Sequence, residues 1–250
     1  MRPSFQDSQD VLQILRSDKQ GGLIVVCGQA VNFWAERYLA EEPRLKDFRP
    51  FTSRDIDVLG NIEEAAKVAL SSGANLKRPP KQAPTPVAAN LSIESAGRIR
   101  LVQFLYDVPG VKRAEIVDFS FPFKTSEISI RIADPIATLT GKVYNLITFD
   151  QKGRFDQKHF DILKLCVPVF IEKQIEAVER ESADSRGTIK HLERLISVSL
   201  STKAKELGRR IDVDWLDFIP RSRIERARDK RLKKFREERV PRWAKRLSVS

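Results

Sequence analysis

The apolar run LIVVC at residues 23–27 constrains the fold more than any other stretch. Its residues do not alternate with polar ones, which is typical of a strand buried on both faces. Such a strand needs cover on both sides, and in α/β proteins helices provide it. Gly28 follows at once, and a helical pattern runs over 29–41. We therefore predict an α/β or α+β fold with a mixed β-sheet flanked by helices.

The remaining pattern extends this prediction along the chain. We expect further strands at 55–59, 88–95, 98–106, 114–121 and 128–132, and a helix at 62–72. From Asp134, a predicted helix N-cap followed by Pro135, the chain turns helical. Pro168 and Pro241 are expected to end helices. We predict an α/β domain over 1–132, a helical domain over 133–220 and a basic helical tail over 221–250.

Asp55-Ile56-Asp57 carries the sharpest chemical signal. Residues i and i+2 of a strand point to the same face, so the two carboxylates are expected to project together. Close carboxylates repel each other unless a cation lies between them. A hard ion such as Mg²⁺ or Mn²⁺ suits this site, since Mg²⁺ binds through one or two carboxylates plus substrate phosphates.

The turn at Gly28 supplies the complementary half of the site. Glycine lets a phosphate approach the backbone closely, and the N-terminus of a helix favours negative charge. Gly28 and Gln29 are therefore predicted to bind the phosphates of a nucleotide, and Asp55 and Asp57 the accompanying metal.

In this order, Gly28 to Ala35 followed by Arg54-Asp55-Ile56-Asp57 resembles the DNA polymerase β-like nucleotidyltransferase superfamily. The nearest branch is the minimal nucleotidyltransferases that include the AbiEii/AbiGii-type toxins. Their signature is Gly-Gly or Gly-Ser, a helix, and Asp-x-Asp on the next strand. The resemblance implies an enzyme that transfers a nucleoside monophosphate from an NTP such as ATP.

The resemblance also implies a third metal-binding carboxylate on a later strand next to the Asp-x-Asp strand. Asp118 in the predicted strand 114–121 is the preferred candidate. The alternative alignment places Gln103 at this position, which would put a neutral amide there.

Other site residues follow from the resemblance or from position. Lys142 resembles a helix lysine that contacts the triphosphate, with a surface lysine as the alternative. Arg54 either contacts phosphate or neutralises the aspartates. His159 stands where relatives have an acid, and we interpret it as a structural or an exposed histidine rather than a general base. The second D-x-D, at Asp212 and Asp214, lacks a preceding glycine turn and is assigned to capping.

The charge is concentrated at one end of the chain. Residues 221–250 hold 13 Lys and Arg against 4 Asp and Glu, so they carry nine of the eleven net positive charges. Such a tail favours a polyanionic partner, here RNA or tRNA, with a solvated helix as the alternative. The two cysteines are far apart, and no apolar run approaches the ~20 residues that span a bilayer. We expect a cytoplasmic protein with no membrane partner.

Three functions remain open from the sequence. The first is a Mg²⁺-dependent nucleotidyltransferase, with RNA or tRNA as acceptor and, from the resemblance alone, a toxin–antitoxin or defence role with an antitoxin partner. The second is a catalytically degenerate relative that binds nucleic acid or a protein. The third is a Mg²⁺-dependent nuclease.

Overall fold

The structure, a computed structural model, describes residues 4–15, 23–80, 82, 85–95, 97–126, 128–181 and 183–248. The chain forms two compact units. The first comprises Met1–Arg37 and Phe48–Gly141, and the second comprises Tyr38–Asp47 and Lys142–Ser250. The division falls inside helix α5 (Pro135–Thr148), whereas the predicted boundaries after residues 132 and 220 stay predictions.

A mixed sheet is the centre of the first unit, as predicted. In the described residues it has seven strands in the order β3-β4-β5-β2-β1-β7-β6. Its strands are β1 (Ile24–Val26), β2 (Ile56–Leu59), β3 (Asn75–Lys77), β4 (Val87–Ser95), β5 (Arg98–Leu105), β6 (Phe121–Lys124) and β7 (Ser129–Ile132).

The apolar run at residues 23–27 contains β1, an inner strand of this sheet. β1 pairs with β2 antiparallel and with β7 parallel, and all three of its residues are buried. Val25 is fully inaccessible, as are Val58 on β2 and Phe104 on β5. Strand β2 in turn pairs with β5 in parallel, so the strand that carries Asp57 is enclosed between β1 and β5.

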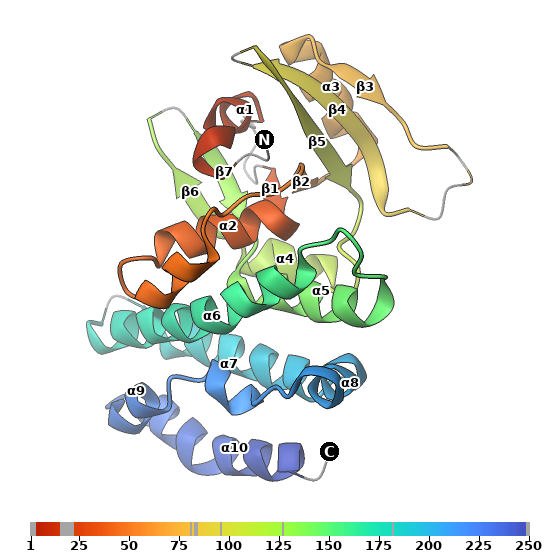
Figure 1. Ribbon diagram of the computed structural model, residues 1–250. Coiled ribbons are helices and arrows are strands. Elements are labelled where there is room, and N and C mark those ends of the chain that lie inside the picture. The colour runs from red at the N-terminus through yellow and green to blue at the C-terminus, as the bar shows by residue number, and fades with distance from the viewer. Residues whose placement is uncertain are drawn as a thin grey trace. The chain divides into compact units, whose positions relative to one another are not determined.

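Helices of the first unit pack beside these strands (Figure 1). They are α1 (Gln9–Ile14), which follows the 3-10 turn η1 (Gln6–Ser8), α2 (Cys27–Arg37), α3 (Ile62–Ser72) and α4 (Arg113–Phe119). The prediction of α3 is confirmed. Asn61 and Glu64 form a capping box at its start, and Gly73 ends it with a positive φ of 67°.

The predicted strand over 114–121 is wrong. Residues 113–119 are the helix α4, and strand pairing begins only at Phe121. A distant side chain stabilises this helix: Arg131 on β7 donates from Nη2 to the carbonyl oxygens of Val117 (2.7 Å) and Ser120 (3.4 Å). Cations at a helix C-terminus satisfy its last carbonyls and complement its dipole.

The second unit is helical. Its elements are α6 (Asp156–Glu179), α7 (Ser185–Ser199), α8 (Thr202–Ile211), η3 (Trp215–Phe218), α9 (Arg221–Arg226) and α10 (Lys230–Ser248), while η2 (Pro43–Phe48) begins in it. Within this unit, α7 lies between α6 and α10 (Figure 1).

The basic segment packs on its unit through an apolar stripe. Leu232, Phe235 and Trp243 on α10 are buried, and Trp243 Nε1 donates to Ser199 Oγ on α7 (2.7 Å). Two predicted helix ends are wrong, because Pro168 lies inside α6 and Pro241 inside α10. Around Pro168 the residues Cys166, Val167 and Val169 are buried, and this packing offsets the hydrogen bond that the proline removes.

Candidate active site at the start of α2

The two acids of the D-x-D lie at the start of β2. Asp57 is in the strand and Asp55 immediately precedes it. Between and after them, Ile56 and Val58 are almost fully buried. This alternation is what a strand with one face in the core requires, and it puts Asp57 on the other face, while Asp55 lies in the bend that leads into the strand.

Arg54 contacts the first of these acids. Its guanidinium lies 3.3 Å from Asp55 Oδ2, with most of the arginine side chain exposed to solvent. Asp55 is 8% exposed, so this arginine supplies local positive charge to a nearly buried carboxylate. Of the two roles predicted for Arg54, the contact observed is the neutralising one.

Helix α2 starts beside Asp57. In the antiparallel pairing of β1 and β2, Val26 is the partner of Asp57, and α2 begins at the next residue, Cys27. Gly28, which is buried, is therefore two residues from the partner of Asp57. Residues opposite each other in an antiparallel pair have Cα atoms about 4.5–5.5 Å apart. The first turn of α2 thus lies close to the acid-bearing strand.

The unusual backbone at this turn belongs to Cys27, not to Gly28. Cys27 has φ of 55°, in the left-handed region that favours glycine. The sequence reasoning assigned the glycine turn to Gly28 and missed Cys27. A Gly-Gly signature aligned one residue earlier would have placed a glycine at this position.

Gln29 faces the interior of the first unit. Its side chain is 1% exposed, accepts a hydrogen bond from Asn32 Nδ2 (3.2 Å) and donates to Ser8 Oγ (3.4 Å). The side chain therefore links α2 to the N-terminal segment. A contact between Gln29 and a phosphate would have to come from its backbone N–H.

Gln103 occupies the position next to Asp57 on the neighbouring strand, β5. In the parallel pairing of β2 and β5, Asp57 is the partner of Gln103, and β5 contains no acidic residue. Gln103 Nε2 donates to Asn90 Oδ1 on β4 (3.1 Å). An amide pair, Gln103 and Asn90, thus continues the row of polar side chains that begins with Asp57.

Asp118 does not complete the acid pair. It lies on the exposed face of α4, not on a strand next to β2, and the prediction that placed it there is wrong. Among the described residues, no three His, Cys, Asp or Glu side chains are grouped to hold a metal ion. The oxygen groups on and beside β2 are the carboxylates of Asp55 and Asp57 and, on the paired strand β5, the amide of Gln103. These are ligand types that Mg²⁺ accepts.

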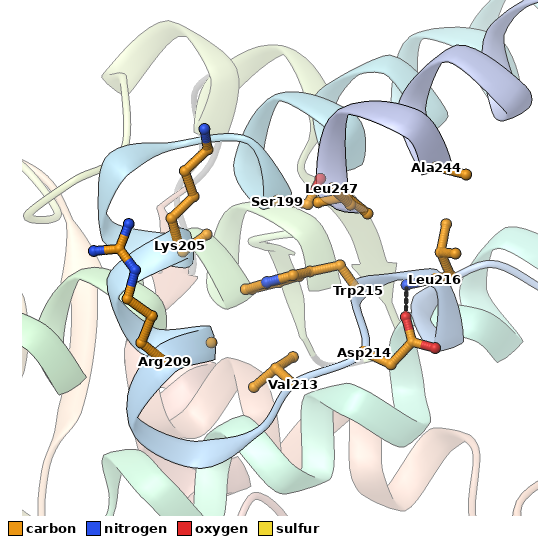
Figure 2. A pocket seen from close by; sticks show the side chains of 11 residues that line it. Ser199, Lys205, Arg209, Val213, Asp214, Trp215, Leu216, Ala244 and Leu247 are labelled. Atoms are coloured by element: carbon orange, nitrogen blue, oxygen red, sulfur yellow. Dashed lines mark hydrogen bonds between the residues drawn. The ribbon is translucent and has the colours of Figure 1, made fainter. Parts of the chain in front are cut away.

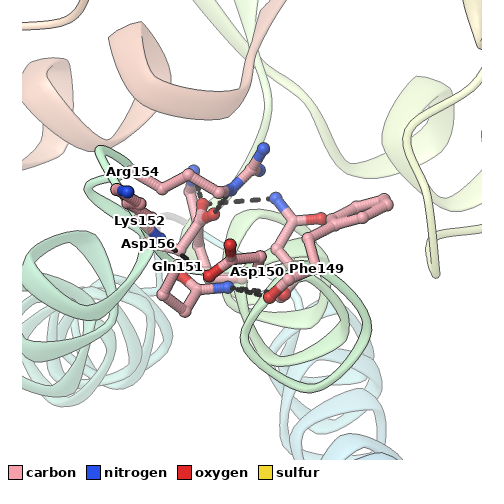
Figure 3. Close-up of polar contacts among 8 residues, drawn as sticks. Phe149, Asp150, Gln151, Lys152, Arg154 and Asp156 are labelled. Carbon is pink, nitrogen blue, oxygen red and sulfur yellow. Dashed lines mark hydrogen bonds and ion pairs between the residues drawn. The ribbon is translucent and has the colours of Figure 1, made fainter.

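Lys142 belongs to the second unit, where it pairs with an acid. Its Nζ lies 2.8 Å from Asp156 Oδ1, and both side chains are almost fully buried. Asp156 also accepts from Arg154 Nε (2.6 Å) and Asn145 Nδ2 (3.2 Å), as Figure 3 shows around the loop that Gln151 closes. Burial raises the pKa of Asp156, but Lys142 and the hydrogen bonds outweigh it and lower the pKa to about 2. Lys142 is thus a partner in a buried ion pair.

His159 is a buried neighbour of this ion pair. It is 5% exposed and packs edge-to-face on Phe155. Burial, and then the charge of Lys142, lower the pKa of His159 well below its ordinary value, so the ring is neutral at physiological pH. This environment agrees with the interpretation of His159 as a structural residue.

The comparisons with known proteins add no family assignment. No protein-family model matches the chain, and no curated protein is detectably similar to it. Within the described part of the chain, none of the helices combines the length and the apolar character that crossing a membrane requires.

Proposed function

We propose that this chain is a Mg²⁺- or Mn²⁺-dependent nucleotidyltransferase that transfers a nucleoside monophosphate from an NTP, such as ATP, to a hydroxyl acceptor. The observation that carries the proposal is the pairing of Val26 with Asp57, which joins the start of α2 to the D-x-D strand. An anion-binding helix terminus beside a pair of carboxylates is the arrangement that a metal-bound triphosphate needs.

Each part of the site has a distinct role in this proposal. The N–H groups at the start of α2 bind phosphate oxygens, and Asp55 and Asp57 hold the metal ion. The ion, when bound, neutralises charge on the phosphates and on the leaving pyrophosphate. Gln103 provides a neutral oxygen where a third carboxylate is expected from the resemblance.

A second function is favoured by that same glutamine. Two-metal phosphoryl transfer needs carboxylates enough to hold both ions, and a neutral amide binds a divalent ion more weakly. The pairing of Asp57 with Gln103 therefore favours a protein that binds a nucleotide with one metal ion and transfers it slowly or not at all. The two functions share the binding site and differ in turnover.

RNA or tRNA is the acceptor that the charge distribution favours. On α10 the exposed cations include Lys233, Lys234, Arg239, Arg242 and Lys245. Clusters of this kind bind phosphates without reading sequence. A toxin–antitoxin or defence role in the cytoplasm, with an antitoxin protein as partner, rests on the family resemblance alone.

A transfer assay with matched variants tests the proposal. The protein is incubated with each α-labelled NTP, Mg²⁺ and total RNA, and label in RNA is counted. Asp57→Asn is expected to abolish transfer, and Asp118→Asn, which removes an exposed acid of the same unit, is expected to leave it unchanged.

The outcomes separate the competing functions. Label transfer that survives Asp57→Asn, or that is lost equally in Asp118→Asn, contradicts the assigned site. Nucleotide binding by calorimetry that depends on Asp57 but yields no transfer supports the binding function. Shortening of the RNA without label transfer supports a nuclease instead.

A further inference from the structure

A pocket of about 390 Å³ lies within the second unit, between α8, η3 and the C-terminal part of α10 (Figure 2). Its volume is within the range of about 300–1,000 Å³ that is usual for small-molecule sites. Most of its lining is apolar and comes from Ala204, Val213, Trp215, Leu216, Ala244 and Leu247. An apolar pocket of this size suits the body of a small ligand.

Trp215 is the fixed wall of the pocket. Its ring is stacked on Phe218, with centroids 5.1 Å apart and planes at 23°. Asp214 caps the same turn by accepting a hydrogen bond from the backbone N–H of Leu216 (2.8 Å). Figure 2 shows the indole between Leu247 and Val213, with its nitrogen toward α8. The stacking and the cap therefore both hold the indole in this position.

Two cations lie on the α8 side of the pocket. Lys205 and Arg209 both line it and are one helical turn apart. Within the described part of the chain, neither has an acidic partner within 4.0 Å. Like charges at this spacing destabilise a helix by a few tenths of a kcal/mol, and an anion between them would remove that penalty.

The charged residues lie at opposite sides of the pocket and would orient a bound ligand. Asp214 lines it from the side opposite α8 (Figure 2). Its carboxylate is already paired with Arg221 (3.9 Å) and with the N–H of Leu216, so it offers an anion no partner there, whereas Lys205 and Arg209 attract one at the other side. A ligand with one apolar end and one anionic end therefore fits in a single orientation.

We propose that this pocket binds a small amphipathic anion, an aromatic body bearing one carboxylate or similar acid group. The aromatic body lies against Trp215, and the acid group binds Lys205 and Arg209. This site is independent of the proposed nucleotidyl transfer, because every residue that lines it belongs to the second unit.

Gly208 offers a way to close the pocket without disturbing the fold. A Cβ atom added at Gly208 would meet only Trp215 Nε1, at 3.9 Å, which is ordinary van der Waals contact. The backbone at this position is helical, so alanine is expected to stabilise α8 slightly. The longer side chain of Gly208→Leu extends into the pocket and is expected to exclude a ligand.

A pair of fluorescent probes tests both halves of the proposal. Anilinonaphthalene sulfonate carries an aromatic body and an acid group, and phenylnaphthylamine has a similar body without the charge. The full-length protein is expected to bind one molecule of the sulfonate, in competition with naphthoate. In Lys205→Met/Arg209→Met the sulfonate should bind at least about tenfold more weakly, a loss of about 1.4 kcal/mol, and phenylnaphthylamine about equally well.

Matched variants control the charge and the location. Lys190→Met/Arg210→Met removes two exposed cations that do not line the pocket and is expected to leave both affinities unchanged. Gly208→Leu should weaken both probes, and Gly208→Ala should bind the sulfonate with less than about threefold loss.

Three results would overturn the proposal. They are an unchanged sulfonate affinity in Lys205→Met/Arg209→Met, an equal loss for the uncharged probe in that variant, and full binding by a folded Gly208→Leu protein. If Gly208→Leu does not fold, the comparison of the two charge variants decides between support and rejection.

Discussion

Asp57 on β2 and Gln103 on β5 are partners in a parallel strand pair, and this pairing places an amide where the site would need a third carboxylate. Asn90 on β4 accepts a hydrogen bond from that amide, so the polar row crosses three strands. The proposed metal site therefore involves this row of amides as well as the D-x-D.

Introducing a third carboxylate at position 103 should strengthen metal binding. Gln103→Asp is expected to raise the affinity for Mg²⁺ in the presence of an NTP by about tenfold, because a charged ligand replaces a neutral one. Without metal the same variant should melt at a lower temperature, since carboxylates on adjacent strands repel. Calorimetry and melting curves with and without Mg²⁺ measure both effects. Gln103→Asn is the neutral control, and unchanged Mg²⁺ affinity in Gln103→Asp would contradict the assigned position.

The backbone at Cys27 predicts opposite effects of two substitutions. Cys27→Gly should raise the free energy of unfolding by about 1 kcal/mol, because glycine adopts a positive φ without a steric penalty. Cys27→Val should lower it by more than that, because a branched side chain is poorly tolerated there. Chemical denaturation measures both variants, and equal effects of the two would show that the conformation at Cys27 is not strained.

The buried side chain of Gln29 predicts a structural effect without a binding effect. Gln29→Leu should lower the free energy of unfolding by about 1–3 kcal/mol, because Asn32 and Ser8 lose a buried partner. Affinity for the NTP and Mg²⁺, measured on the folded variant by calorimetry, should change less than about twofold. If the variant instead lost nucleotide affinity but kept wild-type stability, the side chain of Gln29 would contact the phosphates directly.

The ion pair of Lys142 and Asp156 predicts a loss of stability that depends on pH. Lys142→Met should lower the free energy of unfolding at pH 7 by about 3 kcal/mol, because it leaves a buried carboxylate with fewer partners. The pKa of Asp156 is lowered to about 2, so the pair contributes fully above the ordinary pKa near 3.8 and is lost as pH falls through 2. The difference between variant and wild type should therefore shrink between pH 4 and pH 2 in urea titrations.

A double variant controls this experiment. Asp156→Asn in the Lys142→Met background removes the stranded charge and should recover part of the stability. If Lys142→Met instead weakens NTP binding at unchanged stability, the lysine acts on the phosphates, as the resemblance implies.

For Glu36 on α2 we expect stability to fall as pH rises, the opposite of the dependence expected for the Lys142–Asp156 pair. Burial and then the charge of Asp7 raise its pKa to about 6, against a weaker opposing effect of Arg49. A raised folded-state pKa stabilises the protein fully below the ordinary value of 4.5, and this contribution is lost as pH rises through 6. Glu36→Gln should therefore be more stable than wild type at pH 8, by about 1 kcal/mol after allowance for solvent screening, and equal to it at pH 4. Glu94→Gln, which removes an exposed acid on β4, is the control variant.

Local patterns in the sequence determined much of the fold. The unbroken apolar run at 23–27 predicted an inner strand, because such residues need burial on both faces, and β1 is that strand. Asp134 was predicted as a cap, and its Oδ1 accepts from the backbone N–H groups of Ile136 (2.7 Å) and Ala137 (2.9 Å). These features depend on residues a few positions apart, so the sequence alone contains their physical cause.

The tertiary structure decided the features that depend on distant partners. Residues 113–119 form the helix α4, and Arg131 on β7 satisfies carbonyl oxygens at its end, a contact between elements that no local pattern indicates. Pro168 does not end α6, because burial of the turns around it outweighs the lost hydrogen bond. The sequence identified the D-x-D, but it left Asp118 and Gln103 as alternatives for the residue beside it and favoured Asp118. Only the pairing of β2 with β5 places Gln103, rather than Asp118, beside Asp57, because strand pairing joins residues that no local pattern relates.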